Sequence, residues 1–412
     1  MHTLKKLIVI LYLAMLIVMA MATFVEKSHS TDFAHAYVYG AWWFVALWGA
    51  LAAAGVAYYI MYMRKSKPFG KSLLRGCADT GLHFAFVLIL AGALCSHLFG
   101  YNGTIHLRSN LPENMMVVND NGRYPIKHLP FKVILNDFRI MEDESGRVVD
   151  YVSRFSIIDN EGQRQCEVSM NNICKYGEYR FYQTSYDDDL QGSVLTINHD
   201  YYGIAITYTG YLLLFLSFLL LVLRKQKKPS AANGLAKHSR KRQWWIAALV
   251  VLLTALWCLD YFVLDGSWRE IPILRHPLLA IHVVTIILAY ALLLIMAVRS
   301  LWWLVRKSAQ SPSQNPASQS KELVVALGLL SAGIFIGAIW ANVSWGNYWS
   351  WDAKETWALI TLMVYAVPAH RRSLPVFSNP KVYHTYILLA FLSILMTYFG
   401  VNYFLTGMHS YA

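Results

Sequence analysis

A series of apolar runs separated by short polar stretches extends along this chain. A helix needs roughly 17 to 25 predominantly apolar residues to cross a bilayer. Nine runs approach or reach that length, the eighth being short, and they lie at Leu7 to Phe24, Val38 to Tyr62, Leu82 to Phe99, Gly203 to Leu223, Trp244 to Val263, Pro277 to Val298, Leu323 to Ala341, Thr356 to Ala369 and Tyr383 to Phe404. With 56% hydrophobic and 15% charged residues in 412, a soluble globule is excluded. The sequence predicts an all-α polytopic membrane protein with about nine transmembrane helices.

Basic residues predict the orientation. Lys and Arg gather in alternate loops, and the short loops of the opposite set, at 25–37, 265–277, 343–353 and 405–412, contain only Lys27, Arg269 and Arg275. By the positive-inside rule the basic loops are cytoplasmic, so we expect the N-terminus inside and the C-terminus outside. The net charge of +12 is then mainly a topology signal, and we expect no nucleic-acid partner. The first run also resembles a secretory signal, with Ala20 and Ala22 at a cleavage-like site, but its length favours a retained anchor.

One long segment is not membrane-like. Residues 101–202 contain alternating stretches such as FKVILNDFRI and SVLTINHD, separated by turns such as DNEG. They predict a small external β domain between the third and fourth spans. Within it, Cys166 and Cys174 could be bridged in an oxidising compartment. The predicted parts are residues 1–100 with three spans, the β domain at 101–202, a fourth span with a basic cytoplasmic linker at 203–243, and a second membrane domain at 244–412.

The stretch WGNYWSWDAKETWALI interrupts the apolar runs with a dense aromatic patch in a predicted external loop. Trp and Tyr are common at both membrane interfaces, so an aromatic belt is the simpler interpretation, and it suffices for Trp244 or Trp303. The density here favours a broad, flat aromatic surface suited to a large planar ligand. The residues that would form it are Trp345, Gly346, Tyr348, Trp349 and Trp351.

Two acidic residues follow these aromatics, and they have a structural interpretation. Asp352 and Glu355 stand at capping-box spacing, with Asp352 as the N-cap of a helix and Glu355 reaching back. We prefer this interpretation to a direct catalytic role.

The positive-inside rule places four histidines in two layers of the membrane, two in each. His282 and His409 belong to the outer layer beside the aromatic loop, and His83 and His370 lie toward the cytoplasmic ends of spans. Ionisable groups inside spans are functional candidates, and two facing imidazoles can ligate a haem iron. Spacing alone is weak evidence, because four further histidines are also near span boundaries: His35, His97, His276 and His384.

The aromatic stretch resembles the tryptophan-rich WWD signature of haem-handling proteins. The flanking pieces HVVTIILAYALL and GVNYFLTGMHSYA resemble the CcsA (ResC) branch, and the resemblance covers residues 244–412. Upstream, HFAFVLILAGALCSHLFGYNGTIHLRSNLPENM and YRFYQTSYDDDLQGSVLTINHD resemble CcsB (ResB), the partner of CcsA. The chain is therefore similar to a compact CcsB–CcsA fusion.

The resemblance implies System II cytochrome c biogenesis in the bacterial inner membrane. It implies a holocytochrome c synthase that binds haem b, carries it to the outer face and attaches it to the CxxCH motif of apocytochrome c. His282 and His409 match the external axial ligands, His370 the transmembrane histidine of the CcsA part and His83 that of the CcsB part. A thioredoxin-like thiol reductant with a membrane electron donor is the implied further partner. No residue is assigned as a catalytic acid or base.

Two other functions stay open. A transmembrane b-type cytochrome in quinol electron transfer also uses histidine pairs at two depths, but needs no tryptophan-rich external loop. Alternatively, the chain is a haem-binding scaffold for a separate synthase. Quinol-dependent turnover would favour the first alternative, and failure to produce covalent haem would favour the second.

Overall fold

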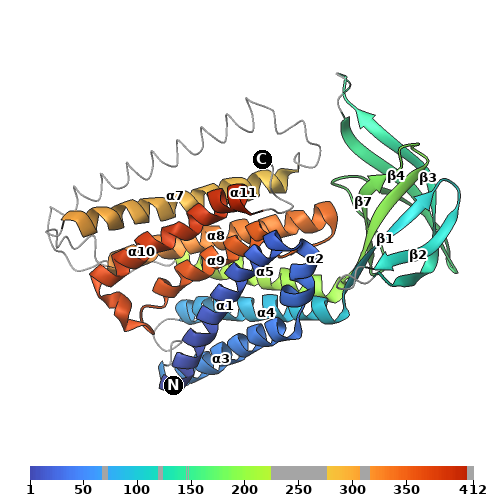
Figure 1. Cartoon of the computed structure of the whole chain (residues 1–412). Helices are drawn as coiled ribbons and strands as arrows, with labels where there is room; N and C mark the ends of the chain where they lie inside the picture. Colours follow the sequence, from blue (N-terminus) through green and yellow to red (C-terminus); the bar gives the residue numbers. More distant parts are fainter. Residues whose placement is uncertain are drawn as a thin grey trace.

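The chain folds into a helical bundle with a β domain at one end (Figure 1). The computed structural model describes residues 1–66, 73–118, 124–144, 146, 148–223, 276–306 and 316–405. The helices are α1 (His2–Ser28), α2 (Thr31–Ala34), the π-helix η1 (His35–Tyr39), α3 (Trp42–Ser66), α4 (Leu73–Phe99), α5 (Tyr201–Leu223), α7 (Pro277–Arg306), α8 (Pro316–Trp345), α9 (Ala353–Ala369), the 3₁₀ turn η7 (Pro375–Ser378), α10 (Pro380–Leu395), the π-helix η8 (Met396–Gly400) and α11 (Val401–Phe404).

Seven helical segments in the described part of the chain are long and apolar enough to cross a membrane. They are α1, α3, α4, α5, α7, α8 and the continuous rod of α10, η8 and α11. The predicted eighth span forms α9, which has 17 residues and is short for a bilayer-spanning helix. The predicted fifth span, Trp244 to Val263, lies outside the described residues. The total of nine spans therefore remains a prediction.

Alternating apolar residues fold residues 101–199 into one antiparallel sheet in the order β5-β4-β3-β2-β1-β8-β7-β6. Its strands are β1 (Tyr101–Arg108), β2 (Pro112–Val118), β3 (Ile126–Glu142), β4 (Val148–Asp159), β5 (Gly162–Val168), β6 (Cys174–Tyr176), β7 (Tyr179–Tyr186) and β8 (Gly192–His199). A disulfide between Cys166 and Cys174 joins the two edge strands, so the sheet is rolled and its edges are protected. For so short a loop, this cross-link stabilises the domain by roughly 2 to 3 kcal/mol.

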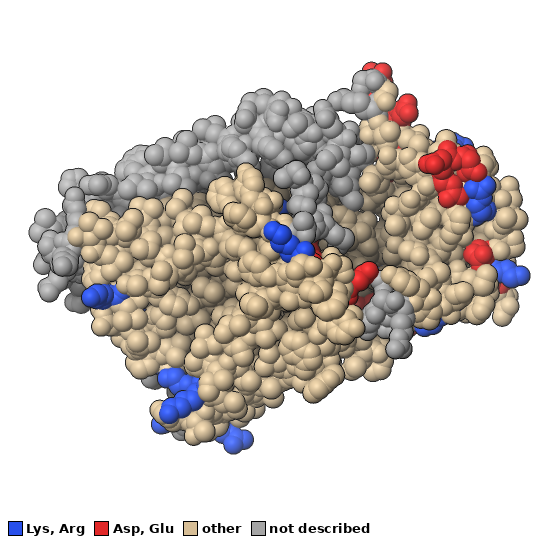
Figure 2. Space-filling view, viewed as in Figure 1, with Lys and Arg blue, Asp and Glu red and all other residues tan. Residues whose placement is uncertain are grey.

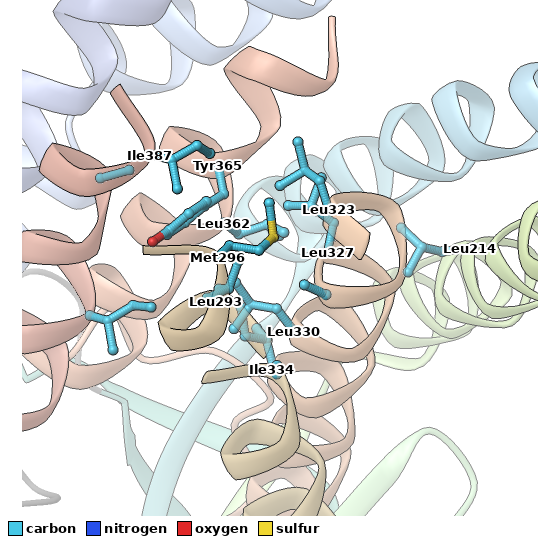
Figure 3. Close-up of a cluster of buried hydrophobic side chains, with 14 of the residues drawn as sticks. Leu214, Leu293, Met296, Leu323, Leu327, Leu330, Ile334, Leu362, Tyr365 and Ile387 are labelled. Atoms are coloured by element: carbon cyan, nitrogen blue, oxygen red, sulfur yellow. The ribbon is translucent and has the colours of Figure 1, made fainter. Parts of the chain in front are cut away.

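The bundle core unites helices from both halves of the sequence (Figure 3). Leu214 of α5 belongs to the same buried cluster as Leu293 of α7, Leu330 of α8, Leu362 of α9 and Ile387 of α10. Close van der Waals packing is the main source of helix association in lipid. Helix α5, which leaves the β domain, is thus a structural part of the C-terminal membrane domain.

Charge differs between the two ends of the molecule in the view of Figure 2. The end of the bundle far from the β domain shows Lys and Arg, whereas Asp and Glu gather mainly on and near the β domain, which also carries some Lys and Arg. Arg64 and Lys65, for example, end α3. This is the distribution that the positive-inside rule associates with a cytoplasmic bundle end, and the membrane orientation itself remains a prediction.

Candidate functional site

The aromatic loop, residues 345–352, connects the end of α8 to the start of α9. Asp352 is the N-cap of α9, and its Oδ1 accepts a hydrogen bond from the Glu355 backbone N–H at 2.8 Å. The predicted capping role of Asp352 is thus confirmed. Glu355 reaches back further than predicted, because its Oε2 accepts from the backbone N–H of Ser350 at 2.8 Å. The two carboxylates therefore fix the shape of the loop from its helical end.

The tryptophan rings do not form the broad, flat surface that we predicted. Trp349 and Trp351 meet edge to face, with an interplanar angle of 85°. Trp345 packs against Trp340 at 71°. Aromatic pairs favour such tilted contacts because the positive ring edge attracts the negative face. The half-buried rings therefore offer faces and edges at several angles.

The β domain holds the start of this loop through side-chain contacts. Asn198 of β8 donates a hydrogen bond to the Gly346 carbonyl at 2.9 Å. Asn102 of β1 donates to the Asn347 side-chain oxygen at 3.0 Å. Asn102 and Asn198 stand opposite each other on the paired strands β1 and β8, and together they fix the loop against the β domain.

Two further loop residues are fixed by packing. The Tyr348 hydroxyl lies 2.8 Å from Ser96 Oγ of α4, and burial raises the pKa of Tyr348, which keeps the phenol protonated. Gly346 has φ of +88°, and a Cβ at this position would lie 2.8 Å from the Tyr182 ring. Only glycine suits both the left-handed backbone and this close approach.

A basic residue lies close to the loop. Lys354 stands in the first turn of α9, where burial lowers the pKa of its ammonium group and nearby Asp352 opposes that shift.

His282 lies in α7, and its orientation is fixed by α8. Its Nδ1 donates to the Gly333 carbonyl at 2.7 Å, because a carbonyl can only accept. In that tautomer Nε2 carries the lone pair, the arrangement in which metal-binding histidines are usually held. Gly337 lets the imidazole approach, since a Cβ there would lie 2.6 Å from Nδ1. Gly337 is eight residues before Trp345, which places His282 about 12 Å along α8 from the loop. Its predicted partner His409 lies outside the described residues.

The structure brings His83 of α4 and His370 at the end of α9 together. Their ring centroids are 6.0 Å apart, with an interplanar angle of 82°. His83 Nδ1 donates to the Asp79 carbonyl at 2.7 Å, and His370 Nδ1 donates to the Ala366 carbonyl at 2.8 Å. Tyr59 of α3 also stacks on His83 at 4.6 Å. Both imidazoles are therefore oriented through Nδ1, which leaves the lone pair on Nε2 in each.

Two of the other histidines near span boundaries have structural partners that an interaction in the structure shows. His384 is fully buried, 3.0 Å from Ser300 Oγ, and Trp303 stacks on it at 4.6 Å. Trp303 is itself only half-buried, and its interpretation as a belt residue stays a prediction. His35 contacts the aromatic loop itself, a contact that the sequence analysis did not identify.

Two family models match this chain. Residues 212–409 match the cytochrome c assembly protein family, and residues 71–219 match the ResB-like family. Protein NrfI of Wolinella succinogenes is 39% identical over 155 residues, or 34% of this chain and 17% of that protein. Cytochrome c biogenesis protein CcsA of Chlamydomonas reinhardtii is 36% identical over 150 residues, or 34% of this chain and 42% of that protein. CcsA of Oryza sativa is 46% identical over 90 residues, or 21% and 28%. The chain thus spans less than half the length of each of these relatives.

Proposed function

Because the chain joins a ResB-like segment to a cytochrome c assembly segment, we propose that it acts in System II cytochrome c biogenesis. It binds haem b, delivers it to the outer face of the membrane and attaches it to the CxxCH motif of apocytochrome c. The observation that carries the proposal is the convergence of His83 and His370, one from each matched segment, at 6.0 Å. Bringing two oriented imidazoles together at the end of a membrane bundle, where His370 is exposed, suits haem ligation.

The inner site is the His83–His370 pair. A metal–imidazole bond measures about 2 Å, so two rings bound to opposite faces of one iron have centroids on the order of 6 Å apart. The centroid separation of His83 and His370 supports this role. The pair would receive haem before it reaches the outer site.

The outer site combines the aromatic loop with His282 and, in our proposal, His409. His282 would ligate the iron through Nε2. The rings of Trp345, Trp349 and Trp351, which lie at different angles, would contact the porphyrin. The haem would then present its vinyl edge to the apocytochrome. Both the ligand and the loop are fixed by their neighbours, which reduces the cost of ordering the substrate.

The reaction adds each cysteine thiol of CxxCH across one haem vinyl group. A carbon–sulfur bond forms, and the thiol hydrogen ends on the terminal vinyl carbon, so each addition is balanced without an oxidant. The thiols must be reduced, which is the expected task of a thioredoxin-like reductant and its membrane donor. Because the cysteine thiols are themselves the nucleophiles of this addition, the protein would contribute mainly positioning.

A single-turnover reaction tests this function and separates it from the alternatives. The purified, haem-loaded protein is mixed with a reduced CxxCH peptide, and haem that stays with the peptide after acidic organic extraction is measured. We expect covalent haem in proportion to the protein. Retained haem with no transfer would indicate a scaffold, and quinol-dependent electron transfer without transfer to the peptide would indicate a b-type cytochrome.

Replacing His83 or His370 with alanine is expected to lower the haem that reaches the outer site by at least about tenfold, because loss of groups around a metal site has effects of this size. Haem per protein and covalent cytochrome yield measure the effect. His97→Ala is the matched control, since His97 is exposed at the other end of α4. Normal haem content in both inner variants would remove these residues from the haem path.

Gly346→Ala should displace the aromatic loop. A left-handed backbone costs a non-glycine residue about 1 to 2 kcal/mol, and the new methyl group would also meet the buried Tyr182 ring. We expect cytochrome yield to fall by at least about tenfold, because a displaced loop would no longer position the haem for the reaction. Gly177→Ala is the control, because Gly177 has φ of +56° but no atom within 4 Å of the added Cβ. Similar yields from the two variants would show that the close packing of Gly346 is unimportant.

A further inference from the structure

The aromatic loop has a second support, which lies outside both family matches. The N-terminal arm, residues 23–44, comprises the end of α1, α2, η1 and the start of α3. The matched segments begin only at residue 71. The arm nevertheless packs directly against the loop, on residues other than those that the β domain contacts.

Ring contacts join the arm to Trp351. Tyr39 of η1 stacks on the Trp351 ring, with centroids 5.0 Å apart and an interplanar angle of 10°. Phe44 of α3 meets the same ring edge to face at 5.2 Å. Tyr39 and Phe44 are only 4% and 1% exposed, so both rings are held by their own surroundings and can hold Trp351 in turn.

Hydrogen bonds join the arm to residues on both sides of Trp351. His35 Nε2 donates to the Ser350 carbonyl at 2.7 Å. Trp357 Nε1 of α9 donates to Thr23 Oγ1 of α1 at 3.1 Å. The arm is thus fixed to the residue before Trp351 and to the helix that follows it.

Trp351 needs such support because of its backbone. Its φ is +56°, in the left-handed region that a residue with a large side chain seldom adopts. Such conformations persist only where surrounding contacts over-determine them, and they concentrate at functional sites. The His35 hydrogen bond and the Tyr39 stack are two of the contacts that keep Trp351 in this state. We expect that their loss would let the backbone relax and the indole change direction.

We propose that His35 and Tyr39 are positioning residues of the outer haem site. They act through Trp351, whose indole they hold at the angle needed to grip the porphyrin. The site then has three contributors: the C-terminal membrane domain supplies the loop, the β domain fixes Gly346 and Asn347, and the N-terminal arm fixes Ser350 and Trp351. The identity of the ligand in this inference rests on the proposed function. The contacts by which the N-terminal arm fixes the aromatic loop do not depend on that function.

Hydrogen exchange of the haem-free, full-length protein tests whether the N-terminal arm fixes the aromatic loop. In Tyr39→Ala and His35→Ala, we expect amides within residues 348–356 to exchange at least about tenfold faster. The Ser350 amide, which donates to Glu355, is the most informative probe. Tyr39→Phe should keep the wild-type rate because it keeps the stacked ring. Unchanged exchange in both alanine variants would overturn the proposal.

The controls lie in the same arm. Tyr37 is 64% exposed in η1, and His29 is exposed beyond the end of α1, so Tyr37→Ala and His29→Ala should leave exchange of the loop unchanged. Exchange in β1 and β8 reports whether each variant is folded. Faster amide exchange that is confined to the aromatic loop supports the proposal that the arm fixes the loop. Equally faster exchange in the β domain or in the control variants contradicts it.

Haem titration of the same proteins tests the link to the ligand. Tyr39→Ala should weaken haem binding at the outer site by about tenfold and alter its visible spectrum, and Tyr39→Phe should restore both. Faster loop exchange with unchanged haem affinity and spectrum would overturn the positioning role. If the wild-type protein itself bound no haem, the proposed function would fail, and the exchange result would still decide whether the arm holds the loop.

Discussion

Replacing His282 with alanine is expected to reduce covalent cytochrome yield by at least roughly 100-fold, because removal of a metal ligand should cost no less than the loss of the groups that merely orient one. The Nδ1 bond to the Gly333 carbonyl fixes the direction of this imidazole, and alanine has no ring to occupy the same place. Haem per protein, the low-spin spectrum and the cytochrome yield measure the loss.

Added imidazole should restore part of the His282→Ala activity, because the vacated space beside Gly337 can admit a free ring. His276→Ala is the matched control, since His276 precedes the same helix and its Nδ1 accepts from the Leu278 backbone N–H. Full activity and an unchanged spectrum in His282→Ala would show that this histidine is not an axial ligand.

The triple alanine variant of Trp345, Trp349 and Trp351 should lose haem retention while still inserting into the membrane. Each aromatic contact contributes about 0.5 to 1.5 kcal/mol beyond area burial. Three such contacts correspond to a loss of binding of roughly 10- to 2,000-fold. Single Phe replacements should be milder, because they keep a ring at each place.

The control for this triple variant is a set of exposed aromatic residues. Trp42, Trp302 and Tyr403 are 80%, 40% and 74% exposed, as expected of membrane-facing side chains. Their combined replacement by alanine should leave haem per protein unchanged. Equal losses from the two triple variants would return the loop tryptophans to an interfacial anchoring role.

Much of the fold could be predicted because its signals are local. The length of apolar runs predicts the described spans, and strict alternation predicts the strands between α4 and α5. The capping residue Asp352 was predictable for the same reason, since an N-cap and its partner are three residues apart.

The geometry of the site depends on contacts between distant residues. The charge rule assigned His83 and His370 to one layer, but depth does not determine that two rings on different helices meet. The support from His35 and Tyr39 was missed, since residues 35 and 351 are neighbours only in the folded chain. The flat aromatic surface was wrongly predicted, because the density of tryptophans in the sequence carries no information on the angles between their rings. A clue was available in the cluster of histidine and aromatic residues at 35–44.

In our proposal, this one chain attaches haem to apocytochrome c. Co-expression of the full chain with an apocytochrome that carries CxxCH, in a bacterial host lacking its own cytochrome c maturation system, tests this activity. We expect covalent haem on the cytochrome, dependent on both cysteines of the motif and on His282. A folded, haem-containing protein that yields no covalent cytochrome in such a host would contradict the claim.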